Sequence, residues 1–102
     1  MNYESYAELK RQKTRLALLQ LLAADPAGEA GAALLMQALP ADCRAGYDQV
    51  ETELAWLATM GLVTGALAGG VRLARITMQG LDIVEGRVRV PGVARIDPGG
   101  AA

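Results

Sequence analysis

Eight residues of this sequence have side chains and spacing suited to contact with a nucleic acid. Arginine binds phosphate and guanine edges, and threonine, tyrosine and aspartate can hydrogen-bond to bases or to the sugar-phosphate backbone. Four of the eight fall between positions 44 and 52, and the others form two close pairs. The set comprises Arg44, Tyr47, Asp48, Thr52, Arg72, Arg75, Arg87 and Arg89. This pattern predicts a surface for duplex DNA.

Other chemistry lacks the residues that it needs. The sequence has no histidine and only one cysteine, Cys43, so a His-based triad, an internal disulfide and a metal centre of several Cys or His ligands are not expected. No pair of carboxylates, glycine-rich phosphate loop or activated nucleophile can be assembled from the spacing. We therefore predict a protein that is not an enzyme and that binds no metal and no cofactor.

Length and composition predict one folded domain. The 102 residues are enough for a single core, and 52% hydrophobic with 21% charged residues is typical of a globular chain. We find neither a long apolar run for a membrane helix nor a signal-peptide pattern at the start, so a cytoplasmic protein is expected. The net charge of −1 argues against a protein that coats nucleic acid without specificity.

The first element should be a long helix, from about residue 6 to residue 24. Ser5 and Glu8 have the spacing of a capping box, and Pro26 forces the chain out of the helix. The leucines between 16 and 22 point in almost every direction, which indicates a central core helix; the alternative is that one side forms a homodimer seam. The basic residues lie around the whole circumference, so a solvated face is expected for Lys10, Arg11, Lys13 and Arg15.

Two shorter helices should follow. Leucines 34, 35 and 39 indicate a helix over 31–39 that ends at Pro40. The next helix should begin after Gly46 and bury Val50, Leu54 and Leu57, which recur at helical spacing. Gly61 is expected to end this helix in the left-handed conformation, with the following leucine packed back on the last turn.

The remaining elements should be a hairpin, a short helix and a tail. Two β-prone segments, 62–67 and 71–76, flank Gly69-Gly70, a pair that favours a tight turn. Thr77 can cap a helix from 78 to 85, which Gly86 would close. The division expected is a domain over 1–86 and an extended tail over 87–102 with little or no intrinsic order.

This order of elements is that of a mainly α-helical winged helix-turn-helix, in which the second and third helices form the turn motif and the hairpin forms the wing. The chain also resembles a family of small proteins encoded by Mu-like phages and prophages. The matching features are Tyr3, Tyr6, Arg15-Leu16-Ala17, Glu53-Leu54-Ala55-Trp56-Leu57, Gly61-Leu62-Val63, Gly80-Leu81-Asp82, Gly86-Arg87-Val88 and Val90-Pro91-Gly92-Val93.

The resemblance implies a phage protein of the host cytoplasm with a fold similar to that of metal-sensing repressors. Those sensors hold metal through several Cys or His ligands, and this chain offers only Cys43, so metal control is not expected. The helix order and the positions of Arg44, Arg72 and Arg75 favour a DNA-binding transcription regulator of a phage or prophage, dimeric through the leucine-rich first helix.

A second interpretation uses the same scaffold for a protein partner. The outward face of the third helix should carry Asp48, Thr52, Ala55 and Thr59, and its acidic residues, with Glu51 and Glu53 beside them, would repel phosphates. Fold alone does not assign function. The alternative is therefore an adaptor or assembly module that binds another phage protein, with Trp56 and Met60 as the anchors, although such a tryptophan is more often covered by its own chain.

Overall fold

The computed structural model describes residues 2–96, and α1 (Tyr3–Ala24) is its longest element. The cap differs from the expected one, because the Asn2 side chain accepts a hydrogen bond from the Ser5 amide at 2.8 Å and the helix begins three residues early. Asn2 satisfies an open helix amide just as Ser5 would have done. At its other end α1 stops at Asp25, immediately before Pro26, as predicted.

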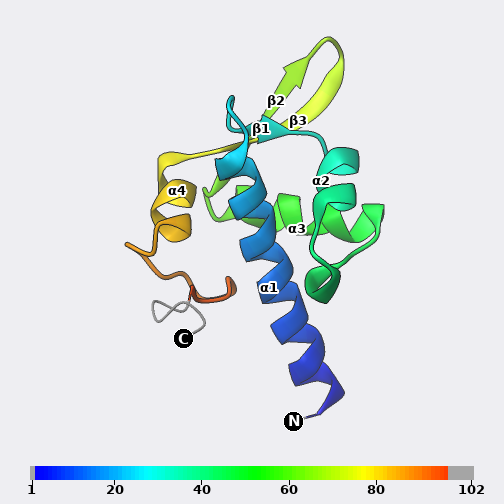
Figure 1. Cartoon of the computed structure of the whole chain (residues 1–102), viewed down its shortest axis with the longest axis vertical. Coiled ribbons are helices and arrows are strands. Elements are labelled where there is room, and N and C mark those ends of the chain that lie inside the picture. Colours follow the sequence, from blue (N-terminus) through cyan, green and yellow to red (C-terminus); the bar gives the residue numbers. More distant parts are fainter. Residues whose placement is uncertain (1, 97–102) are drawn as a thin grey trace.

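The core surrounds α1, which confirms the prediction of a central helix. Figure 1 shows α1 running between α4 (Met78–Val84) and α2 (Ala32–Ala38), with α3 (Tyr47–Thr59) crossing behind it. The fully buried side chains come mainly from α1 and α3, and they are Leu18, Leu19, Leu22, Leu35, Val50, Leu57 and Glu53. A short 3-10 turn, η1 (Ala41–Cys43), joins α2 to the loop before α3.

Gly61 ends α3 as the sequence predicts. Its φ is +78°, its amide donates to the Ala58 carbonyl, and the Leu62 amide donates to the Leu57 carbonyl at 2.9 Å. These two bonds are the Schellman arrangement that satisfies the last carbonyls of a helix. Leu62 is buried, so the chain turns directly from α3 into the wing.

The wing is the hairpin of β2 (Val63–Ala68) and β3 (Val71–Ile76), joined by Gly69 and Gly70, both at positive φ. A third strand, β1 (Glu29–Ala30), was not predicted. It pairs antiparallel with the inner end of β3, so the order in the sheet is β1-β3-β2. Two residues are too short to give a strand pattern, and β1 exists only because β3 offers a free edge there.

Thr77 connects the end of α3 to α4. Its hydroxyl accepts from the Gly80 amide at 3.1 Å, which is the predicted cap, and donates to the Gly61 carbonyl at 2.8 Å. A Cβ on Gly80 would collide with the Leu62 carbonyl oxygen. The glycine therefore allows α4 to approach the strand that leaves α3.

Residues 87–96 form no helix or strand, but they pack against the rest of the domain. The expectation of a tail with little order is therefore wrong for this segment. Val93 is buried, the Ala94 amide donates to the Gln12 carbonyl at 3.1 Å, and Gly92 lies against the Trp56 ring. These contacts join residues far apart in the chain, which local sequence does not reveal. Residues 97–102 of the expected tail lie outside the described part, and the domain boundary after Gly86 stays a prediction.

None of the helices within residues 2–96 has the length and apolar character needed to cross a bilayer.

Candidate nucleic-acid interface

The outward face of α3 is exposed as predicted. Asp48, Thr52, Ala55 and Thr59 are all accessible. The Thr52 hydroxyl donates to the Asp48 carbonyl at 3.0 Å, and its oxygen keeps free lone pairs. Thr52 can therefore accept a hydrogen bond from a ligand without losing its own contact with the helix.

Arg44 and Tyr47 lie at the start of α3. Arg44 is exposed at the end of η1, and Tyr47, half exposed, is the first residue of the helix. Gly46 caps the helix without a side chain, so the first amides of α3 have no side-chain acceptor at the cap. This end of the helix combines a guanidinium with a positive helix terminus.

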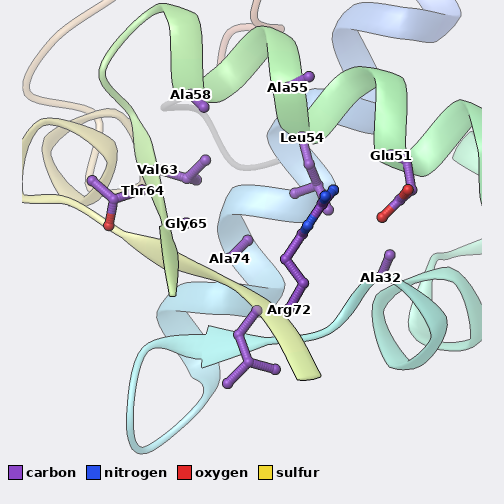
Figure 2. A pocket seen from close by; sticks show the side chains of 11 residues that line it. Ala32, Glu51, Leu54, Ala55, Ala58, Val63, Thr64, Gly65, Arg72 and Ala74 are labelled. Atoms are coloured by element: carbon purple, nitrogen blue, oxygen red, sulfur yellow. The ribbon is translucent and has the colours of Figure 1, made fainter. Parts of the chain in front are cut away.

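A hollow of about 170 Å³ separates α3 from the wing. Figure 2 shows Arg72 extending from β3 into this hollow towards Leu54, with Glu51 on the helix beyond. Leu54, predicted to be core, is only partly buried because one side of it lines this space. The hollow thus carries one positive and one negative side chain.

Two of the predicted arginines are held by acidic neighbours. Arg75 Nη2 lies 2.6 Å from Glu29 Oε2, across the β1-β3 pair that the sequence did not reveal. Arg87 is paired with Asp82 and Glu85, and these carboxylates raise the pKa of its guanidinium. By contrast, Arg44 and Arg72 form no ion pair within residues 2–96.

The structure does not bring all eight predicted residues together. Arg44, Tyr47, Asp48 and Thr52 lie along α3 and the loop before it, and Arg72 faces the same helix from the wing. Arg87 and Arg89 follow α4, and Figure 1 shows this segment on the opposite side of α1 from α2. We therefore describe the candidate interface as α3 together with the base of the wing.

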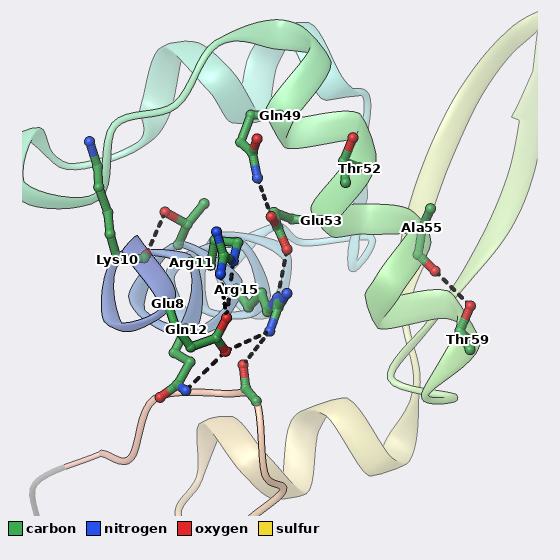
Figure 3. A network of polar contacts seen from close by, with 12 residues as sticks. Glu8, Lys10, Arg11, Gln12, Arg15, Gln49, Thr52, Glu53, Ala55 and Thr59 are labelled. Carbon is green, nitrogen blue, oxygen red and sulfur yellow. Dashed lines mark hydrogen bonds and ion pairs between the residues drawn. The ribbon is translucent and has the colours of Figure 1, made fainter. Parts of the chain in front are cut away.

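Arg15 and Glu53 form a buried ion pair that the sequence did not reveal (Figure 3). Arg15 Nε donates to Glu53 Oε1 at 2.6 Å, and the Gln49 amide donates to the other carboxylate oxygen. Arg15 is 7% exposed and Glu53 1% exposed, so the expected solvated face is wrong for Arg15, and Glu53 does not repel an approaching phosphate.

Trp56 is covered mainly by its own chain, which is the commoner arrangement for such a residue. The Arg15 guanidinium carbon lies 4.0 Å from the ring centroid, a cation-π contact, and Gly92 packs on the ring edge. The neighbouring Met60 is 43% exposed. Of the two anchors proposed for a protein partner, Met60 is therefore the more accessible.

Cys43 is a buried free thiol, and burial, followed by the nearby Asp42, raises its pKa. The Thr14 hydroxyl of α1 donates to its carbonyl at 3.0 Å. Within residues 2–96 there is no group of three His, Cys, Asp or Glu side chains that could hold a metal ion.

Two solved structures have a similar fold. A MarR family transcriptional regulator from Streptomyces coelicolor, Sco5413, superposes with a TM-score of 0.62 and 26% identity over 72% of this chain. A structure described as a "possible transcriptional regulator for arsenical resistance" superposes with a TM-score of 0.55 and 32% identity over 71% of it. The chain spans about half (49%) of the Streptomyces protein and 68% of the other. The winged helix-turn-helix prediction is thereby confirmed.

In sequence, no protein-family profile matches the chain. A curated relative does match: "Uncharacterized protein gp26" of Escherichia phage Mu is 34% identical over 92 residues, which cover 89% of this chain and 95% of the phage protein. The similarity runs through nearly the whole of both chains, as the features quoted from the sequence imply. This winged-helix protein therefore belongs to the family of phage Mu gp26.

Proposed function

We propose that this protein is a phage or prophage transcription regulator that binds duplex DNA. The observation that carries the proposal is the exposed polar face of α3, with Thr52 at its centre, between Arg44 and Arg72, which pair with no acidic residue in the described part of the chain. Both structurally similar proteins are described as transcriptional regulators, the second as a possible one, which supports the same function here.

In this proposal α3 enters the major groove. Tyr47, Asp48 and Thr52 face the base edges, where Asp48 suits the amino group of cytosine. Arg44 and Arg72 contact phosphates at the two ends of the helix face. The other three arginines contribute less. Acidic neighbours neutralise Arg75 and Arg87, and both Arg87 and Arg89 lie away from α3.

We further propose that the regulator acts as a homodimer in the host cytoplasm, without catalytic activity. Leu18, Leu19 and Leu22 of α1 are fully buried within the chain, so they cannot form the seam. Leu9 is the leucine of α1 that stays exposed, at 43%. A dimer through the first helix would therefore use the side of α1 that carries Leu9, and light scattering at tens of micromolar protein would test it.

Titration of the protein into a fluorescent pool of mixed duplexes, at about 50 mM salt and then at higher salt, tests DNA binding. We expect binding at micromolar protein that weakens as salt rises. Thr52→Ala should reduce the preference among duplexes, while Gln20→Ala, an exposed change on α1, should not. An absence of binding at micromolar protein, or a salt dependence near zero, would exclude the proposal.

An adaptor that binds another phage protein is the second candidate. The favouring observation is that Asp48 and Glu51 give α3 an acidic face, while the wing tip is apolar, with Leu67 77% and Val71 58% exposed. Met60 and the partly covered Trp56 would add to such a contact. Recovery of a neighbouring phage product that Leu67→Ser fails to bind would support this function over DNA binding.

A further inference from the structure

A second hollow, of about 400 Å³, lies between the first half of α1 and the loop that leads into α3. Both elements supply polar or aromatic side chains to it. Those that bear on the argument are Tyr3, Tyr6, Lys10, Arg11, Arg44 and Gln49. We call this hollow the α1-α3 groove. No local sequence pattern groups these residues, because the groove forms only when residues 44–46 fold beside α1.

The groove is positively charged. Lys10, Arg11 and Arg44 line it, and no carboxylate is among the described residues that do so. The hollow beside the wing differs, since there Arg72 faces Glu51. On this side of the molecule the positive charge is therefore concentrated in the α1-α3 groove and not beside the wing.

The cations of the groove differ in how firmly they are placed. Arg11 is fixed by Glu8, whose Oε1 accepts from its Nε and Nη2 at 3.0 and 2.8 Å, so Nη1 remains to donate. Lys10 and Arg44 have no ion-pair partner within residues 2–96. The groove thus offers one oriented guanidinium and two cations that an incoming anion can engage.

The start of α3 adds to this charge. Gly46 lines the groove and precedes a helix of 13 residues, whose amino-terminal end carries a partial positive charge. The next two residues, Tyr47 and Asp48, already belong to the α3 face assigned to DNA above. The groove and that face are therefore continuous along the chain.

Two exposed tyrosines form the outer wall. Tyr3 is 82% and Tyr6 58% exposed, and Figure 1 shows the start of α1 projecting beyond the other helices. A tyrosine can pack its ring on a sugar and hydrogen-bond a phosphate through its hydroxyl. Tyrosine hydroxyls beside cations suit phosphate oxygens, whereas an acidic peptide needs only the charge.

We propose that the α1-α3 groove binds the phosphate backbone of the duplex next to the segment that α3 contacts. The inference rests on the proposed DNA-binding function and adds to it a contact surface on α1. It assigns Lys10 to DNA, with a smaller contribution from Arg11, which Glu8 already holds, although their helix lies outside the turn motif and the wing. The expected gain is affinity and not base preference, because phosphates carry no sequence information.

Duplex titrations of Lys10→Gln and Lys13→Gln across a series of salt concentrations test this contact. Lys13 is a matched control: it is exposed on the same helix and does not line the groove. Lys10→Gln should weaken binding to all duplexes alike and lower the slope of log affinity against log salt by about 1. Lys13→Gln should leave the slope unchanged.

Several results would overturn the inference. If wild type binds duplex but Lys10→Gln keeps its slope, or if Lys13→Gln lowers the slope equally, the groove is excluded while DNA binding stands. If wild type binds no duplex, both proposals fail. Binding of poly-glutamate that depends on Lys10, without any dependence for duplex, would assign the groove to a protein. If the Tyr6→Ala variant differs from wild type in its mass by light scattering but keeps the same affinity for duplex, the groove would be assigned to a second copy of this chain.

Discussion

The Arg15 guanidinium and the Glu53 carboxylate join α1 to α3 through a buried ion pair, with Nε and Oε1 2.6 Å apart. The same guanidinium donates to the Gly92 carbonyl at 2.9 Å and covers the Trp56 ring. Arg15 thus joins α1, to which it belongs, to α3 and to the C-terminal segment at one point. It fixes the position of α3 relative to the rest of the domain.

Glu53→Ala should lower the free energy of unfolding by about 3 kcal/mol, because it leaves the buried Arg15 charge with only the more distant Glu8 carboxylate, at 3.7 Å, as an ion-pair partner. Urea denaturation followed by circular dichroism measures the loss. Glu51→Ala, two residues earlier on the same helix and only partly buried, should cost less than about 0.5 kcal/mol.

The double variant Arg15→Met/Glu53→Met separates two contributions to that loss of stability: the lost attraction within the ion pair, and the cost of a buried charge that has no close partner. Replacing both charges with apolar groups of similar size should recover most of the stability, since the cost comes from an unpaired charge. A Glu53→Ala loss no larger than that of Glu51→Ala would show that the pair contributes little.

Gly92→Ala should release the C-terminal segment from Trp56. Gly92 has φ +99°, and an added Cβ would lie 2.5 Å from Trp56 Cζ2, so both the backbone and the contact become strained. Trp56 is the only tryptophan, and its emission should move to longer wavelength as water reaches the indole. Gly69→Ala is the control: Gly69 also has positive φ but nothing within 4 Å, so emission should not change.

Arg72→Gln and Arg75→Gln should differ in their effect on duplex binding. Arg72 has no ion-pair partner within residues 2–96, while Arg75 is held by Glu29 and is already neutralised. We expect Arg72→Gln to lower the salt slope by about 1 and Arg75→Gln to change it by much less. Equal effects would mean that the Glu29 contact gives way when DNA binds.

Glu8 should make the stability depend on pH in the acid range. Hydrogen bonds from Gln12, then from Arg11, lower the pKa of its carboxyl in the folded protein. The folded value lies below the unfolded value of about 4.3, so the stabilisation is present above that pH and is lost as the pH falls through the folded pKa. Glu8→Gln should reduce stability at pH 7 by less than about 1 kcal/mol, because the side chain is 40% exposed.

Acid titrations of stability check this expectation. The difference between wild type and Glu8→Gln should shrink as the pH is lowered, and Gln12→Ala should reduce the same difference because it removes the first of the two causes. A difference that is constant from pH 7 to about pH 3 would exclude a role for the Glu8 charge.

Local signals in the sequence predicted most of the fold. The stripe of Val50 and Leu57, the left-handed Gly61, the Gly69-Gly70 turn and the Thr77 cap each act within a few residues. Such signals place α3, the wing and α4 correctly. The exposed face of α3 followed from the same helical spacing.

Contacts between distant residues could not be predicted in this way. Arg15 meets Glu53 38 positions away and Gly92 77 positions away, and nothing near any of them indicates the pairing. The β1 strand and the Arg75–Glu29 ion pair also depend on the tertiary fold. For this reason the prediction from the sequence assigned more arginines to DNA than the structure leaves free of ion pairs. It also missed the packing of the segment after Gly86.

The wing is three strands wide only at its base. β1 pairs with β3 at Ala74 and Arg75, and from Leu73 to the Gly69-Gly70 turn the hairpin is a two-stranded ribbon. A narrow ribbon twists and bends more easily than a wider sheet. The three-stranded base therefore holds the inner end of the hairpin at a fixed distance from α3. The two-stranded outer half is the part that can bend to fit surfaces of different curvature.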